Sequence, residues 1–175
     1  MKSFSANLRK LVGDAKTMRP LLCEGNPLTC KVALIGANPG TTTSFWKFWS
    51  DQRGMDRQGW IEAYKLEHGG KFNRSRAAIE RFVPLVAARV VELNAHEAYS
   101  KRMAALPIPL RTTEVLAFAL GAVRPKVIIC AGVNASKAVR DMTLPWHPKV
   151  LNERHFIYWG KESERQLAAK VNRLL

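Results

Sequence analysis

The sequence predicts an α/β fold: a three-layer α/β/α sandwich around a short, mostly parallel sheet of about four strands. Short apolar runs of strand length alternate along the chain with longer segments of helical periodicity. Such alternation indicates β–α–β units, in which crossover helices cover both faces of a parallel sheet. The length of 175 residues suits one domain that spans residues 1–175.

Four runs are interpreted as the strands of this sheet. The most apolar is 126–132, with five consecutive apolar residues and one cysteine among them, which is typical of a strand buried on both faces. The first strand, 31–35, ends in a Gly/Pro turn, and the second, 89–94, ends in an asparagine. The aromatic-rich run 155–159 is predicted as the fourth strand.

Helices are expected between and around these strands. Pro84 is expected to kink or restart the helix over 75–88. Thr43 or Ser44 offers an N-cap for a helix over 45–49. The polar stretch 51–70 contains a helical pattern, although the sequence assigns no role to this stretch. The predicted helices span 4–16, 45–49, 60–66, 75–88, 114–123, 134–141 and 162–175.

The turn after the first strand, Gly36-Ala37-Asn38-Pro39-Gly40, is the most informative segment of the chain. Gly36 and Gly40 permit backbone approaches that a Cβ hinders, and Pro39 stiffens the turn between them. Asn38 is the one polar side chain of the turn, and it lies at the carboxyl end of a core strand, where open α/β sheets bind ligands. An ordinary βα turn has the same composition, so the turn alone leaves both interpretations open.

Two nucleotide-binding motifs are excluded by the same residues. A Walker-type phosphate loop needs a lysine after its last glycine, whereas Thr41 follows Gly40. The dinucleotide fingerprint needs three glycines at fixed spacing, and this turn contains only Gly36 and Gly40.

Charge is the second strong feature of the sequence. Lys and Arg total 28 against 14 Asp and Glu, which gives a formal net charge of +14 and a pI near 10.2. The basic residues are spread along the chain, as expected for a basic face on a folded domain rather than for a disordered arm. This excess favours a polyanionic partner, and we expect that partner to be nucleic acid.

The sequence supports no metal, cofactor or membrane association. Cys23, Cys30 and Cys130 are too few for a disulfide framework and lack zinc spacing. No segment approaches the roughly 20 apolar residues of a membrane span, and the first residues lack the apolar core of a signal peptide. We therefore expect an intracellular, cytoplasmic protein in a reducing compartment.

Three segments together resemble the uracil-DNA glycosylase superfamily. The turn 36–40 is similar to its first motif, most closely in the mismatch-specific and single-strand-selective branches that carry Gly-x-Asn-Pro-Gly. The run 90–94, Val-Val-Glu-Leu-Asn, resembles the second strand of the family, and 124–135 resembles its third strand and following turn. The segments occur in the family order, and the resemblance extends over about residues 31–175.

The resemblance implies an enzyme that hydrolyses the N-glycosidic bond of uracil or another deaminated or damaged base in single- or double-stranded DNA, with the base extruded into a pocket. It implies that Asn38 positions the attacking water and that Asn94 reads the pyrimidine edge, since an amide both donates and accepts. Phe48 or Trp49 would stack on the base. The other residues of the first motif would line the pocket: Gly36, Ala37, Pro39 and Gly40.

The last motif of the family is not clearly matched. Family members usually place His-Pro-Ser or Asn-Pro-Ser at the end of the fourth strand, where the histidine stabilises charge on the leaving base. Here His147-Pro148 precedes the last predicted strand, and Lys161 follows it. Either residue remains a candidate for the role of that histidine. The three scattered cysteines exclude the iron–sulfur branches of the family.

Two other functions remain open. The altered last motif, and an asparagine where the fastest branches use aspartate, fit a catalytically weak or inactive relative that binds nucleic acid or a free base. A hydrolase of a small nucleoside-like substrate is the third alternative.

Overall fold

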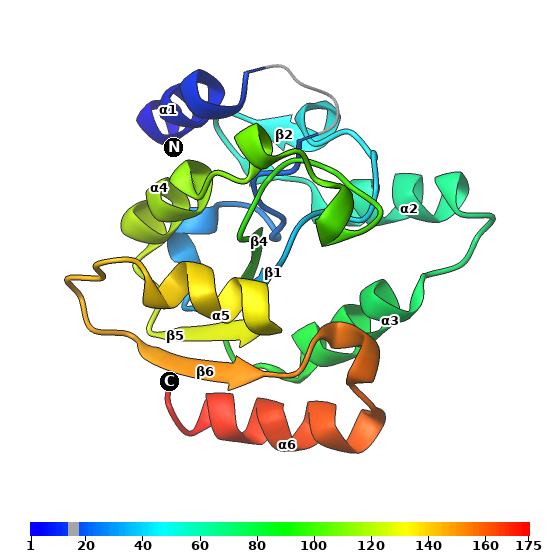
Figure 1. The fold of residues 1–175 in the computed structure, drawn as a ribbon, viewed down its shortest axis with the longest axis vertical. Helices are drawn as coiled ribbons and strands as arrows, with labels where there is room; N and C mark the ends of the chain where they lie inside the picture. Colours follow the sequence, from blue (N-terminus) through cyan, green and yellow to red (C-terminus); the bar gives the residue numbers. More distant parts are fainter. Residues whose placement is uncertain (14–17) are drawn as a thin grey trace.

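A four-stranded parallel sheet with the strand order β4-β1-β5-β6 forms the centre of the protein (Figure 1). The computed structural model describes residues 1–13 and 18–175. A short antiparallel hairpin, β2–β3, lies apart from this sheet. The strands are β1 (Val32–Gly36), β2 (Trp49–Ser50), β3 (Gly54–Met55), β4 (Val90–Asn94), β5 (Val127–Ala131) and β6 (Lys149–Glu153).

Helices cover both faces of the sheet. Within the described residues, none of them is long and apolar enough to cross a membrane. The α-helices are α1 (Lys2–Val12), α2 (Arg57–Glu67), α3 (Arg74–Phe82), α4 (Glu114–Val123), α5 (Val133–Arg140) and α6 (Lys161–Asn172). Short 3-10 turns are η1 (Pro27–Thr29), η2 (Trp46–Phe48), η3 (Val83–Leu85), η4 (Met103–Ala105), η5 (Ile108–Leu110) and η6 (Phe156–Tyr158).

The buried side chains of β1 alternate between two cores, as the two-residue period of a strand requires. Ala33 and Ile35 join a core with residues of α1, α2, α4 and α5. Val32 and Leu34 join a second core with residues of α3 and α6 on the opposite face. In Figure 1, α6 runs along the lower side of β6, whereas α5 lies above β5. The predicted α/β/α layering is therefore confirmed.

Most predicted elements are observed with small shifts at their ends. The strands predicted at 31–35, 89–94 and 126–132 are β1, β4 and β5, and the helix at 114–123 is α4. The helix predicted over 4–16 is observed as α1, which ends at Val12, and residues 14–17 lie outside the described part. The helix predicted over 75–88 ends at Phe82, and Pro84 lies in the 3-10 turn that follows.

The fourth strand was predicted in the wrong place. The run 155–159 forms a 3-10 turn, and the strand beside β5 is β6, several residues earlier. In this turn Phe156 and Trp159 are buried three residues apart, while Ile157 and Tyr158 remain exposed. In β6, by contrast, Leu151 is the one fully buried residue, because β6 is an edge strand with a polar sequence. Its hydrophobic signal is therefore too weak to identify it.

The helix predicted over 45–49 is also wrong. The segment forms a 3-10 turn that runs directly into β2, and Trp49 pairs with Met55 of β3. The hairpin packs closely on the turn at Gly25: a Cβ on Gly54, whose φ is +89°, would collide with the Gly25 carbonyl group. This backbone-to-backbone contact favours the extended hairpin over a continued helix.

The outer edge of β4 is covered by the chain segment 18–22. This strap runs antiparallel to β4 and its continuation, with bridges from Met18 to Ala98 and from Leu22 to Glu92. The backbone N–H of Arg19 donates to the carbonyl of Glu97 at 3.0 Å. The strap satisfies backbone groups that an exposed sheet edge leaves unpaired.

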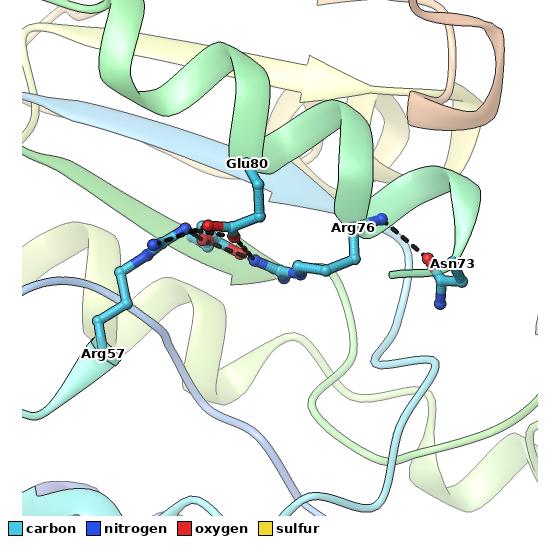
Figure 2. A network of polar contacts seen from close by, with 5 residues as sticks. Arg57, Asn73, Arg76 and Glu80 are labelled. Atoms are coloured by element: carbon cyan, nitrogen blue, oxygen red, sulfur yellow. Dashed lines mark hydrogen bonds and ion pairs between the residues drawn. The ribbon is translucent and has the colours of Figure 1, made fainter. Parts of the chain in front are cut away.

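A buried carboxylate, Glu92 of β4, joins α2 and α3 to the sheet. Arg76 of α3 donates to both oxygens of Glu92, at 3.0 and 2.6 Å, and Arg57 at the start of α2 donates to one of them at 3.0 Å. Glu80 accepts from the same two arginines at 2.6–3.0 Å. Figure 2 shows Arg57 and Arg76 approaching Glu80 from opposite sides.

The charges of this network are mutually dependent. Burial acts to raise the pKa of Glu92, but the positive charges of Arg76 and Arg57 outweigh burial and lower it to about 2. Burial acts to lower the pKa of Arg76, whereas Glu92 and Glu80 together raise it. Removing one member leaves a buried charge without its partner, which costs more free energy than the intact pair contributes.

We expect Glu92→Gln to lower the free energy of unfolding by about 3–5 kcal/mol, measured by urea denaturation with tryptophan fluorescence. The glutamine keeps the shape of the side chain but leaves two buried guanidinium groups with one carboxylate. The exposed Glu62 of α2 provides the matched control, since Glu62→Gln should change stability by less than about 0.5 kcal/mol.

The same variant tests the pH dependence of stability. Glu92 stabilises the fold above its ordinary pKa of 4.5, and this stabilisation is lost as the pH falls towards the folded value. The stability difference between the wild type and Glu92→Gln should therefore narrow between about pH 5 and pH 2. A difference that stays constant over this range would show that the charge of Glu92 is not its source.

Candidate functional site

A cavity of about 420 Å³ opens at the carboxyl ends of β1 and β4. The sheet register pairs Gly36 with Asn94, the last residues of these two strands, and both line the cavity. Its volume lies within the range of small-molecule sites, roughly 300–1,000 Å³. Several further segments line the cavity. They are the segment before β1 (Arg19), the turn after β1 (Ala37, Asn38, Gly40, Thr41), α2 (Trp60, Tyr64), α3 and its N-cap (Asn73, Ser75, Arg76, Ile79), the loop after β4 (Ser100, Lys101, Arg102, Met103), α5 (Asn134) and the turn after β6 (His155, Phe156, Ile157).

Asn38 is held in one orientation by the loop that follows β4. Its Nδ2 donates to the carbonyl of Ser100 at 2.9 Å, to the hydroxyl of Ser100 at 3.1 Å and to the carbonyl of Pro39 at 3.1 Å. The Ser100 hydroxyl in turn donates to the carbonyl of Arg102 at 2.7 Å. Within the described residues nothing donates to Oδ1 of Asn38. The side chain therefore presents a fixed hydrogen-bond acceptor at the cavity wall.

Asn94 lies beside the turn that carries Asn38. Its Nδ2 is enclosed and has no hydrogen-bond partner within residues 1–13 and 18–175. A Cβ built on Gly36 would lie 3.2 Å from Oδ1 of Asn94 and 3.1 Å from the ring of Phe156. The absence of a side chain at Gly36 therefore keeps open the space between these two groups. An unpaired buried amide is expensive, and a ligand that presents both a donor and an acceptor can satisfy it.

His155 contributes a third polar side chain from the turn after β6. Its Nδ1 accepts from the backbone N–H of Ile157 at 3.3 Å, so the neutral ring carries its proton on Nε2. Burial lowers the pKa of His155, which favours this neutral form at pH 7. The side chain thus offers a neutral N–H donor at the strand end where the glycosylase-like resemblance expects a histidine.

Aromatic side chains form the rest of the cavity wall. Trp60 and Tyr64 come from α2, within the stretch 51–70 to which the sequence assigned no role. Both rings are almost fully buried and pack with centroids 5.5 Å apart. The indole N–H of Trp60 has no acceptor within the described part of the chain. Phe156 lies on the other side, between Gly36 and Trp159.

The structure brings together some of the predicted site residues and separates others. Gly36, Ala37, Asn38, Gly40 and Asn94 all line the cavity. Pro39 is buried behind them, and its carbonyl accepts from Asn38.

Four predicted side chains lie elsewhere. Trp49 packs against Phe4 and Phe45 in the core, and Phe48 lines a separate hollow beside the hairpin, so neither faces the cavity. His147 is exposed before β6, at the opposite end of that strand from the cavity. Lys161 is exposed at the start of α6 and does not line the cavity.

The residues that sequence reasoning missed follow from the misplaced fourth strand and from α2. Once β6 is placed at Lys149–Glu153, His155 becomes the histidine just beyond the fourth strand. The signal that identifies it is the position of a strand end, not a motif. Trp60 and Tyr64 carry no sequence signal beyond helical periodicity, which predicts packing equally well.

A second groove, which we call the basic groove for its three cationic side chains, lies next to the cavity. It has a volume of about 730 Å³, and its largely apolar wall includes Lys137 and Arg140 of α5, Arg154 after β6 and one acidic residue, Glu153. His155 lines both the groove and the cavity. Within the described residues, no group of three or more His, Cys, Asp and Glu side chains is placed to hold a metal ion.

We expect the imidazole of His155 to titrate with a midpoint below its ordinary pKa of 6.5, because burial disfavours the charged ring. Side-chain ¹H–¹⁵N NMR should show the proton on Nε2 at neutral pH. Protonation opposes folding at this site, so the contribution of His155 to stability is lost as the pH falls through the folded pKa. A midpoint above 6.5 would contradict this environment.

Comparison with models of protein families gives no match to this sequence, and comparison with curated proteins gives none either. A function must therefore be argued from the site itself. The features that carry such an argument are the fixed acceptor of Asn38, the unpaired amide of Asn94 and the neutral N–H of His155.

Proposed function

We propose that the protein is a DNA glycosylase-like enzyme that hydrolyses the N-glycosidic bond of uracil or a related deaminated or damaged base. The observation that supports this proposal best is the amide of Asn38. Its Nδ2 donates all its hydrogen bonds to groups of the protein, and its Oδ1 is left as the acceptor beside the cavity. An acceptor fixed in this way can orient a water molecule towards the sugar of a bound nucleotide.

The reaction has clear requirements. The bond between C1′ and the base nitrogen breaks, its electron pair leaves with the base, and the water oxygen forms a new bond to C1′. The water gives up one proton to the solvent, from which the released base anion takes up a proton. Positive charge develops on the sugar, and negative charge develops on the base. Asn38 holds the water by accepting one of its hydrogen bonds. Because an amide is a weak base, this arrangement suits an enzyme that relies on leaving-group stabilisation more than on proton abstraction.

Two groups are placed to stabilise and recognise the leaving base. The Nε2–H of neutral His155 donates to a base carbonyl on which negative charge develops. The amide of Asn94 offers a donor and an acceptor to the hydrogen-bonding edge of a pyrimidine. The ring of Phe156 provides an apolar wall for an extruded base. It takes the stacking role that the sequence gave to Phe48 or Trp49.

The basic side chains around the cavity suit a nucleic-acid backbone. Lys101 and Arg102 line the cavity with exposed side chains, and the groove with Lys137, Arg140 and Arg154 adjoins the cavity at His155. Exposed cations near a base-sized cavity can hold the phosphates that flank an extruded nucleotide. DNA is therefore the polyanion that we propose for this basic protein.

We expect Asn38→Ala to slow single-turnover base release by at least about 100-fold, while DNA affinity stays within a few-fold of the wild type. The assay uses excess protein and labelled oligonucleotides that carry uracil, hypoxanthine or xanthine in single strands and in duplexes. His155→Gln should also slow release, whereas His147→Gln, at the opposite end of β6, should leave it unchanged.

The same assay separates the alternatives. If His147→Gln abolished base release and His155→Gln did not, His155 would not be the histidine that stabilises the leaving base. If the wild-type protein releases no base from any of these substrates but still binds them, the catalytic proposal fails. The remaining function is then that of a nucleic-acid or base-binding protein.

Binding to DNA should depend steeply on salt. A protein that neutralises about five phosphates loses affinity with a log–log slope of roughly −4 to −5 on duplex DNA. The triple variant Lys137→Ala, Arg140→Ala, Arg154→Ala should reduce the magnitude of this slope by about 2–3, measured by fluorescence anisotropy.

A control triple variant removes the same number of charges at the other end of the sheet. Lys31 and Lys126 precede β1 and β5, and Arg173 follows α6, all with exposed side chains. Alanine at these three positions should leave the slope nearly unchanged. An equal effect of the two triple variants would show that net charge, not the groove, binds DNA.

A further inference from the structure

Arg19 is a buried arginine whose charge has no partner. The residue is 9% exposed and lines the cavity. Within residues 1–13 and 18–175, its guanidinium makes no hydrogen bond and no ion pair. It lies over the ring of Trp60, 5.4 Å from the centroid. The strap that carries Arg19 is fixed to the continuation of β4 through its backbone N–H, so the base of this side chain is rigidly placed.

The neighbouring acidic groups are already used. Arg57 and Arg76 together occupy the carboxylates of Glu80 and Glu92 through close hydrogen bonds. Glu92 attracts the guanidinium of Arg19 only through space, without a hydrogen bond, and the positive charge of Arg76 repels Arg19. Among residues 1–13 and 18–175, this part of the interior therefore holds three guanidinium groups against two carboxylates. Within that part of the chain the positive charge of Arg19 is left without a counter-ion.

Arg19 stays charged in spite of these surroundings. Burial and the nearby charge of Arg76 lower its pKa to about 10, which is still well above neutral pH. A buried charge without a counter-ion is costly, and its persistence beside an open cavity indicates that a ligand can supply the missing anion. A guanidinium fork matches a carboxylate or phosphate with two parallel hydrogen bonds.

The rest of the cavity wall supports an anionic ligand. Besides Arg19, three further basic side chains line it, and no Asp or Glu is among its described lining residues. The amino terminus of α3 also faces this space through Ser75 and its N-cap, Asn73. The first backbone N–H groups of a helix favour negative charge. The other basic side chains are Arg76, Lys101 and Arg102.

We propose that the cavity contains an anion-binding position at Arg19, so that its ligand carries an acidic group in addition to the base edge that Asn94 reads. That group is a carboxylate attached to the base or the phosphate of a nucleotide. The part of this inference that concerns the base rests on the proposed function, whereas the anion position rests on Arg19 alone.

Matched pairs of ligands test the proposal by isothermal titration calorimetry. Uracil is compared with 5-carboxyuracil, and deoxyuridine with deoxyuridine 5′-monophosphate. We expect the wild-type protein to bind at least one acidic member about tenfold more tightly than its neutral counterpart. In Arg19→Gln this preference should fall to less than about twofold. The exposed Arg173 supplies the control, and Arg173→Gln should retain the full preference.

The outcomes separate the two sources of the anion and the two proposals. A preference limited to 5-carboxyuracil assigns the position to a base carboxylate, and one limited to the monophosphate assigns it to a phosphate. Equal affinity for acidic and neutral members in the wild type would overturn the inference, even if Arg19→Gln does not fold. If no base or nucleoside binds, inorganic phosphate becomes the probe. Phosphate binding that is lost in Arg19→Gln then supports the anion position, and absence of phosphate binding overturns it, whereas the glycosylase proposal is decided separately by the base-release assay.

Discussion

The carboxylate of Glu92 is the interaction on which the architecture of the cavity depends. It projects from the edge strand β4 and binds arginines from two helices, α2 and α3. Arg57 thereby fixes the start of α2, and Arg76 fixes α3. Because these helices supply the aromatic wall and one helix terminus of the cavity, the position of a single acidic side chain determines the shape of the site. A buried network of this kind is better suited to specifying one arrangement than to adding net stability.

The second organising principle is the convergence of parallel strand ends. Asn38 follows β1, Asn94 ends β4 and His155 follows β6, so the three side chains meet at one edge although long stretches of sequence separate them. In both Asn38 and His155, one hydrogen-bonding atom of the side chain is bonded to nearby backbone, and this bond fixes the orientation of the other hydrogen-bonding atom. The protein thus prepares the orientation of these groups before any ligand is present, which is the arrangement that catalysis by positioning requires.

The sequence was sufficient to predict three of the four strands of the sheet, most helices and two of the three polar residues, for physical reasons that differ from residue to residue. Asn38 and Asn94 were predictable because the first closely follows, and the second ends, an apolar strand whose signal is strong on its own. His155 was not, because β6 is an edge strand with polar residues and the apolar turn after it imitates a strand. The place of Arg19 and Trp60 in the cavity wall depends on tertiary contacts between residues distant in sequence. No local sequence pattern predicts such contacts.

His155 stands between two compartments, since the same imidazole lines the cavity and the basic groove. The turn at Gly132, with a φ of +95°, lies close behind it: a Cβ there would be 3.5 Å from the Cβ of His155. The ring therefore borders both compartments with main chain behind it. Rotation about its own side-chain bonds is the main movement that this position leaves to it. A ligand that turned the ring from one compartment would change the volume of the other, and by thermodynamic reciprocity its effect on binding there would be matched by an equal effect in the opposite direction.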